Sequence, residues 1–275
     1  MKTLPLAALA VFVPMLAAMP ARAAIGDWVS NDDKARVRLV VSGTDAAGNL
    51  LAAVEIELAP GWKTYWRTPG DAGIPPILDF TASKNVGKVE VGFPPPERHD
   101  DGYAVTNVYE GRVVLPLTVA VPDQKAGSEL ALKLDVGICS DVCVPDHFEL
   151  ALPVAGGASD AGAGAIVEPA MKALPGKPEP GTFAVDSVKP DGGTPKHAKF
   201  VISATVPDAE KASVFVEGAS DWYADVPEYE PGEGGKALYR FTFDTLGSKT
   251  PLDGGKLRIT IVSDGRAIEQ WVTLP

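Results

Sequence analysis

Two cysteines, Cys139 and Cys143, are the residues of this 275-residue chain whose type and spacing best suit them to chemistry, and the chain has no other cysteine. A disulfide needs Cα atoms about 4.4–6.8 Å apart, whereas residues four apart in a straight strand lie about 13 Å apart. The chain must therefore reverse direction if the two bond. Ser140 and Asp141, which lie between them, are good turn residues. The spacing predicts a tight hairpin or bulge with one cysteine on each arm.

Such a bond is either a structural staple or a redox-active disulfide. Closing so short a loop lowers the entropy of the unfolded chain by only about 2 kcal/mol, against about 3 kcal/mol for a 15-residue loop. A domain of this size buries enough core without that help. Short, turn-constrained disulfides are also among the more easily reduced ones. The residues by themselves leave both alternatives open.

A third alternative is metal binding, because Cys139, Cys143 and His147 are each four residues apart. Thiolates and imidazole bind Cu(I) or zinc. Pro145 disfavours the helix that would place all three on one face, and no fourth ligand is evident nearby. We therefore predict no resident metal and no other cofactor, and we assign no catalytic role to His147 or to the two other histidines, His99 and His197.

The segments around the cysteines have the pattern of β-strands. Within residues 50–58, Val54, Ile56 and Leu58 alternate with Glu55 and Glu57, as in a half-buried strand. Similar runs occur at residues 36–41, 112–121, 130–136, 199–206, 213–216, 237–243, 257–262 and 267–274. No long segment has a helical apolar period. Many short strands with Gly and Pro turns predict an all-β fold of β-sandwiches.

The chain divides where its composition changes. Residues 155–180 are rich in Ala, Gly and Pro, which is typical of a linker, and residues 166–174 suit a short helix inside it. We predict a first β-sandwich over residues 24–156, a linker over 157–180 and a second β-sandwich over 181–275. Asp264-Gly265 predicts a tight hairpin turn in the second sandwich, and Trp222 and Trp271 are expected in its core.

The N-terminus predicts export. Lys2 is followed by a short apolar run, and Ala21-Arg22-Ala23 has the small-x-small pattern of a signal peptidase site. We therefore predict a signal peptide over residues 1–23, cleaved near Ala23, and we see no later segment suited to crossing a membrane. The net charge of −11 disfavours nucleic acid as a partner, because an acidic surface repels phosphate.

Two blocks of sequence resemble the N-terminal periplasmic domain of the DsbD/ScsB thiol-disulfide interchange proteins. The first is residues 61–76 (GWKTYWRTPGDAGIPP), the second is residues 139–145 (CSDVCVP), and residues 93–98 and 109–111 between them also fit. The resemblance covers residues 25–154. Residues 181–275 fit the ScsB layout more loosely, as a further immunoglobulin-like domain.

The resemblance implies an immunoglobulin-like scaffold on which Cys139 and Cys143 shuttle between dithiol and disulfide. It implies a periplasmic thiol-disulfide oxidoreductase of the protein-disulfide reductase type, in the contexts of cytochrome c biogenesis or copper tolerance. The implied partners are a membrane-embedded DsbD/CcdA-like thiol carrier or a thioredoxin-like protein on one side, and periplasmic disulfide proteins on the other. The sequence contains neither a membrane carrier nor a thioredoxin-like domain, so we expect the electron source to be a separate protein.

The same blocks contain candidate supporting residues. Trp62, Tyr65 and Trp66 are expected to shield the sulfurs, to form the partner surface or to pack in the core. Arg67 and Asp71 are expected to pair with each other and hold their loop. The remaining candidates are Asp141, as a turn former or a group that moves a proton, and Tyr109.

One departure from the family pattern concerns the loop before Tyr109. Val108 stands where we expect a glycine. The family pattern therefore does not predict the conformation of residues 104–108, a loop expected near the cysteines. Cys143 precedes Val144-Pro145 while Cys139 follows apolar residues, so we expect Cys143 to be the less buried sulfur and the one that is attacked.

Two rivals to a redox protein remain. One is a non-enzymatic β-sandwich binding or chaperone module with a structural disulfide. The other is a copper-handling protein that uses the reduced cysteine pair.

Overall fold

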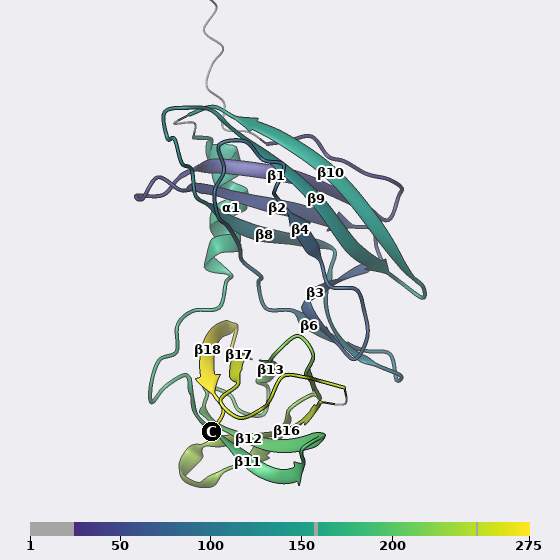
Figure 1. Cartoon of the computed structure of the whole chain (residues 1–275), viewed down its shortest axis with the longest axis vertical. Coiled ribbons are helices and arrows are strands. Elements are labelled where there is room, and N and C mark those ends of the chain that lie inside the picture. Colours follow the sequence, from purple (N-terminus) through teal and green to yellow (C-terminus); the bar gives the residue numbers. More distant parts are fainter. Residues whose placement is uncertain (1–24, 157–158, 246) are drawn as a thin grey trace, which may run out of the picture.

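A computed structural model describes residues 25–156, 159–245 and 247–275 of the chain. The predicted signal peptide, residues 1–23, lies outside the described residues. Within the described ranges the chain forms eighteen β-strands, one α-helix and one short 3-10 helix. The predicted all-β class is confirmed (Figure 1).

The first half of the chain forms two antiparallel sheets. One has the strand order β1 (Ala35–Thr44), β2 (Leu50–Leu58), β8 (Arg112–Val119) and β5 (Val89–Val91). The other has the order β10 (Cys143–Val154), β9 (Ser128–Cys139), β3 (Lys63–Gly70), β7 (Val105–Glu110) and β6 (Glu97–Asp100), and β4 (Ile77–Asp79) also pairs with β9.

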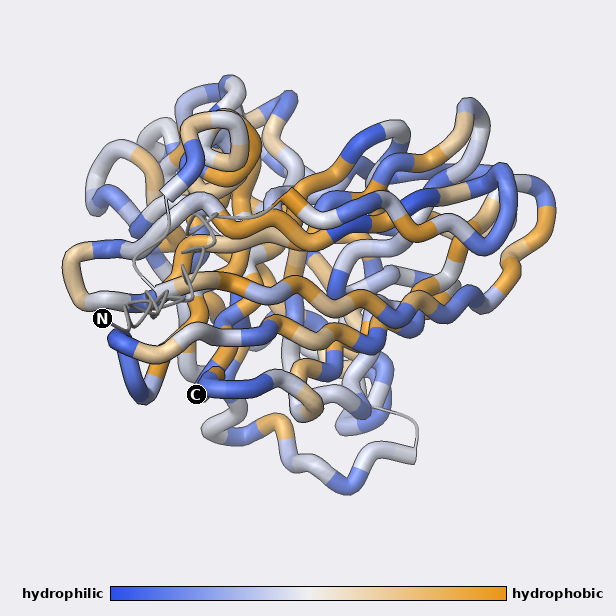
Figure 2. The backbone as a smooth tube through the Cα atoms, turned by 90° about the horizontal axis from the view of Figure 1, so that it is seen from above, coloured by the Kyte–Doolittle hydropathy of each residue, from blue (hydrophilic) through white to orange (hydrophobic). Residues whose placement is uncertain are grey.

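The core lies between these two sheets because alternate residues of each strand point inward. Val37, Leu39 and Val41 of β1 are buried in it. Figure 2 shows the hydrophobic stretches running along the strands, with hydrophilic residues gathered mostly at the turns.

The other face of the first sheet is covered by α1 (Ala161–Lys172), which buries Ala163 and Val167 against Val40 and Ala53 (Figure 1). The helix begins five residues before the predicted 166–174 segment. Its N-cap is Asp160, whose carboxylate accepts a hydrogen bond from the backbone N–H of Ala163 at 2.9 Å. Two glycines in its first turn, at positions 162 and 164, disfavour helix and explain the late prediction.

The second half of the chain also forms two sheets. One contains β11 (Ala184–Thr194), β12 (His197–Thr205), β16 (Ala237–Asp244) and β14 (Tyr223–Ala224), in that order, and β15 (Glu228–Pro231) also pairs with β16. The 3-10 helix, η1 (Glu233–Gly235), lies between β15 and β16. The other sheet has the order β13 (Ser213–Glu217), β17 (Lys256–Ser263) and β18 (Arg266–Thr273). The exact limits of the two predicted domains stay a prediction.

Two local predictions in this half have different outcomes. The tight turn is confirmed, since Asp264 and Gly265 have φ values of 51° and 68° between β17 and β18. Trp222 is buried in the core as expected, but the prediction for Trp271 is wrong because its side chain is 60% exposed. It lies on β18 with the guanidinium of Arg258 5.3 Å from its ring, facing a cavity between the two halves.

A side chain from the second half completes the core of the first. Phe215 of β13 is buried in the core cluster of the first two sheets, and its ring centroid lies 5.4 Å from that of Trp66 on β3. The two halves therefore share a hydrophobic contact, which fixes β3 relative to the sheet β13–β17–β18. In the part of the chain that the structure describes, no helix is long and apolar enough to span a membrane.

Candidate functional site

The two cysteines form a disulfide at the tip of the β9–β10 hairpin. Cys139 is the last residue of β9 and Cys143 the first of β10; they face each other in the antiparallel register with Cα atoms 4.1 Å apart. The N–H of Ser140 donates to the carbonyl of Val142 at 3.2 Å and closes the turn. The predicted hairpin with one cysteine on each arm is confirmed.

The two sulfurs differ in their access to solvent. Cys139 is completely buried, because β9 lies between β10 and β3, where Lys63 pairs with Cys139. Cys143 is exposed, and its neighbours Val142 and Val144 are 67% and 37% exposed. A visiting thiolate therefore meets Cys143 first, at a tip where exposed Val142 and Val144 stand beside the polar Ser140 and Asp141.

Tyr65 of β3 is the side chain that covers the disulfide. Its hydroxyl lies 3.0 Å from the Sγ of Cys143, and its ring packs against Cys139 and Val108. Burial, with the negative charge of Asp101 added to it, raises the pKa of the Tyr65 hydroxyl. The phenol is therefore protonated at neutral pH, and because a disulfide sulfur has no proton, Tyr65 is the donor.

Two glycines make room for the Tyr65 ring. A Cβ atom on Gly73 would lie 2.4 Å from a ring carbon, and one on Gly137 would lie 3.2 Å from another. Gly73 also has a φ of 123°, which side-chain-bearing residues rarely adopt. Both glycines belong to segments that come together only in the fold, so their shared function is not visible in the sequence.

The segment before Tyr109 does reach the cysteines, but from Val105 onward it is strand β7 and not a loop. Val108, which stands where the family pattern predicts glycine, is fully buried against Tyr65 and Cys139. Its side chain therefore adds an apolar wall beside the buried sulfur.

Comparison with known proteins places this geometry in a family. Residues 30–155 match the family model described as the N-terminal part of the thiol:disulfide interchange protein DsbD. This segment belongs to the DsbD N-terminal domain family. Its bonded cysteine pair fits the thiol-disulfide interchange for which the family is named.

A solved structure extends the likeness to the second half. The crystal structure of the N-terminal periplasmic domain of ScsB from Proteus mirabilis superposes with a TM-score of 0.72 at 22% identity, and the match covers 91% of this chain and 98% of that one. At this identity the likeness shows a common fold, which includes the sheets formed by the chain before α1 and those formed after it. Among curated proteins, none matches the sequence.

The other predicted aromatic residues of the DsbD-type domain pack in its core or at the edge of that core. Trp66 is fully buried in the core, with the guanidinium of Arg67 4.3 Å from its ring, so it is not part of a partner surface. Trp62 packs at the edge of that core, with the Nζ of Lys34 5.6 Å from its ring. Tyr109 donates its hydroxyl to the carbonyl of Pro94 at 2.6 Å, and burial raises its pKa. Tyr65 is the predicted aromatic side chain whose hydroxyl contacts a sulfur.

The predicted pair of Arg67 and Asp71 is wrong. Arg67 donates to Glu217 and Glu269, each with a closest N–O distance of 2.6 Å. Asp71 accepts from the backbone N–H of Val105 at 2.8 Å and from the hydroxyl of Tyr223. Three of these partners lie about 150 or more residues further along the chain, beyond the reach of local sequence patterns.

The remaining polar candidates lie around the hairpin. Asp141 is exposed at its tip. His147, on β10, has its Nδ1 2.7 Å from Asp135, and this hydrogen bond, with a weaker one to Glu149, raises the pKa of the imidazole. Among the described residues no three His, Cys, Asp or Glu side chains come together as a metal site.

Proposed function

We propose that the chain carries out thiol-disulfide exchange in the periplasm through Cys139 and Cys143. It passes electrons from a membrane-embedded thiol carrier, or from a thioredoxin-like protein, to periplasmic disulfide proteins. The observation that carries this proposal is the asymmetry of the disulfide, in which one sulfur is buried and the other exposed at a hairpin tip.

The exchange proceeds in two displacements. A thiolate of the reduced partner attacks the Sγ of Cys143, the intramolecular S–S bond breaks, and Cys139 leaves as a thiolate that takes up a proton. The partner's second thiolate then attacks its own sulfur in the mixed disulfide and releases Cys143. Cys143 leaves as a thiolate, so the partner ends as a disulfide, the pair ends as a Cys139 thiol and a Cys143 thiolate, and two electrons have passed to the pair.

The reduced pair then reduces its substrate by the same chemistry. The thiolate of Cys143 attacks a substrate disulfide, and Cys139 resolves the mixed disulfide by attacking Cys143, so that the pair is oxidised again. Cys139 suits the resolving role because it is buried beside Cys143, where an outside disulfide does not reach it.

Tyr65 has a function in this second step. Its protonated hydroxyl lies at the Sγ of Cys143 and donates a hydrogen bond to the thiolate that forms there on reduction. A hydrogen bond to the charged form lowers the pKa of the thiol. The fraction of reactive thiolate at neutral pH therefore rises.

The proposed setting follows from the relatives. The ScsB domain of similar fold is periplasmic by its description, and the predicted signal peptide agrees with export. Roles in cytochrome c biogenesis or copper tolerance stay predictions.

A redox titration tests the proposal. The protein is equilibrated in glutathione buffers of stepped potential, and its free thiols are counted by the mass of an alkylating tag. We expect the pair to change state above about −300 mV. A pair that stays oxidised far below this potential is a structural staple and contradicts the proposal.

Two matched variants test the order of attack. Cys139→Ser leaves the exposed thiol and is expected to accumulate a mixed disulfide with a reactive partner disulfide. Cys143→Ser leaves the buried thiol and is expected to trap little. Equal trapping by both variants contradicts the assignment of Cys143 as the attacking sulfur.

A further inference from the structure

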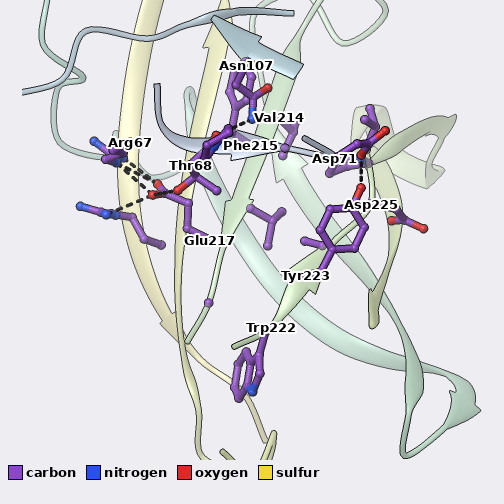
Figure 3. Close-up of a pocket in the computed structure, with 18 of the residues that line it drawn as sticks. Arg67, Thr68, Asp71, Asn107, Val214, Phe215, Glu217, Trp222, Tyr223 and Asp225 are labelled. Carbon is purple, nitrogen blue, oxygen red and sulfur yellow. Dashed lines mark hydrogen bonds and ion pairs between the residues drawn. The ribbon is translucent and has the colours of Figure 1, made fainter. Parts of the chain in front are cut away.

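The residues that directly follow Trp66 on β3 form ion pairs and hydrogen bonds with the second half of the chain. Arg67, whose side chain is 13% exposed, is held by Glu217 at the end of β13 and by Glu269 on β18. The hydroxyl of Thr68 also donates to Glu217 at 2.7 Å (Figure 3). Glu217 is buried and accepts a further bond from Arg258 at 3.1 Å.

The ionisation of this cluster is fixed by its contacts. Burial by itself raises the pKa of Glu217, but the hydrogen bonds and charge of Arg67, the charge of Arg258 and the hydrogen bond from Thr68 together reverse this, so that the pKa lies below its ordinary value. Glu217 is therefore a carboxylate at neutral pH. Removing it leaves the guanidinium of Arg67 without its main partner in a buried position, which is strongly unfavourable.

A second contact lies at the other end of the same segment. The carboxylate of Asp71 accepts from the hydroxyl of Tyr223 on β14, and also from the N–H of Val105 at 2.8 Å (Figure 3). The amide of Asn107 donates to the carbonyl of Thr68 at 2.9 Å. Residues 67–71 are thus tied both to the second half of the chain and to β7.

These ties matter because residues 66–69 have no partners in the ladder between β3 and β7. The regular pairing of β3 with β7 ends at Tyr65 and resumes only at Gly70. Between these residues the backbone lacks the ladder that fixes a strand in its register. The contacts that hold this stretch instead include those of Glu217, Glu269 and Asn107, together with the packing of Phe215 on Trp66. A cavity of about 440 Å³ borders the same contacts.

We infer that Glu217 and Tyr223 are positioning residues for the exchange reaction: by holding residues 67–71 they keep Tyr65 against Cys143. The second half of the chain then has a defined task, which is to set the environment of a sulfur that it does not itself touch. This inference rests on the proposed function of Tyr65 and Cys143.

The test measures the pKa of the Cys143 thiol in the full chain. In a Cys139→Ser background this thiol is the only one, and its pKa is read from the rate of iodoacetamide alkylation against pH. We expect Glu217→Gln and Tyr223→Phe each to raise the pKa, so that alkylation at neutral pH slows by about threefold or more. Glu230→Gln is the control, because its carboxylate pairs with Arg240 within the second half.

A double variant separates positioning from general loosening. If Glu217 acts through Tyr65, then Tyr65→Phe/Glu217→Gln has the same thiol pKa as Tyr65→Phe alone. Additive shifts, or unchanged pH profiles in both single variants, overturn the inference. Tyr223→Phe removes one hydroxyl and keeps the test decisive if Glu217→Gln does not fold.

The outcome is independent of partner turnover. If the wild-type disulfide stays oxidised in the glutathione buffers but Glu217→Gln still shifts the thiol pKa, the proposed function is contradicted and the positioning inference stands. If the wild-type pair exchanges with glutathione but neither variant shifts the thiol pKa, only the positioning inference is contradicted.

Discussion

The hydroxyl of Tyr65 lies 3.0 Å from the Sγ of Cys143, on a strand whose pairing with β7 breaks just beyond it. This contact joins the exposed sulfur to a side chain that is fixed from elsewhere in the molecule. The hairpin alone brings the two cysteines together, but the chemistry of the exposed one depends on where β3 is held. Variants of Tyr65 and of its surroundings therefore report directly on the site.

Tyr65→Phe is expected to raise the pKa of the Cys143 thiol. A hydrogen bond to a charged group contributes about 1.5 kcal/mol or more, and 1.36 kcal/mol corresponds to about one pKa unit. The thiolate fraction at neutral pH is then about tenfold lower, and reduction of a model disulfide slows by less than this factor, because a thiolate of higher pKa is the stronger nucleophile. The measurement is alkylation against pH in the Cys139→Ser background.

Tyr109→Phe is the matched control for this variant. It removes a buried tyrosine hydroxyl from the same domain, but that hydroxyl bonds to the carbonyl of Pro94 and not to a sulfur. The thiol pKa is expected to stay that of the parent protein. An equal shift in both variants shows that the effect is general and that Tyr65 has no special contact with the thiolate.

Gly73→Ala is expected to displace the Tyr65 ring. The added methyl would lie 2.4 Å from a ring carbon and would force a residue with a side chain to adopt a φ of 123°. We expect a loss of about 1–3 kcal/mol in the free energy of unfolding and faster reduction of the uncovered disulfide by dithiothreitol. Unfolding is followed in urea and reduction by the mass of tagged thiols.

Gly61→Ala separates backbone strain from the clash with the ring. Gly61 also has a positive φ, of 79°, but nothing lies within 4 Å of the position of its added Cβ. This variant is expected to lose stability and to keep the reduction rate of the parent. A similar acceleration in both variants means that the rate follows stability and not the position of Tyr65.

The sequence predicts the features of the site that depend on neighbours along the chain. Ser140 and Asp141 favour the reversal that joins the cysteines, and the apolar residues before Cys139 indicate which sulfur is buried. The alternation in residues 50–58 correctly predicts a strand. Glu55, expected on its exposed face, is buried, and this is possible because Arg38 and Arg112 both pair with its carboxylate. In each case the signal lies within a few residues of the feature.

The contacts between the two halves are not predictable in this way. Arg67 has an acidic residue four positions on, which suggests a local pair, but its actual partners are 150 and 202 residues away. Tryptophan is a residue type expected in a core, but Trp271 lies on the side of β18 that faces the first half of the chain. Such placements depend on how the two sandwiches pack against each other, and this packing cannot be deduced from the local patterns of a single sequence.

Phe215→Ala is expected to destabilise both halves together. The ring is 3% exposed, belongs to the core cluster of the first half and contacts Trp66, although it is carried by β13 of the second. Truncation of such a buried phenylalanine costs about 3–5 kcal/mol. We expect a lower urea midpoint in both the near-ultraviolet and the far-ultraviolet circular dichroism signals. A first half that keeps its midpoint while the second unfolds earlier contradicts the shared core.

Acid is expected to release the contact between Glu217 and Arg67. The carboxyl has its ordinary pKa of 4.5 in the unfolded chain and a lower pKa in the folded protein. The unfolded state therefore binds more protons in this range, so the stabilisation from Glu217 is complete above about pH 4.5 and is lost as the pH falls further.

Urea midpoints measured between about pH 3 and pH 7 are expected to fall more steeply in the wild type than in Glu217→Gln. Other carboxylates with lowered pKa values, such as Glu55, contribute equally to both proteins, so the difference between the curves isolates Glu217. Parallel curves would mean that the carboxylate is as easily protonated in the folded protein as in the unfolded chain, and that its pairing with Arg67 adds nothing to stability.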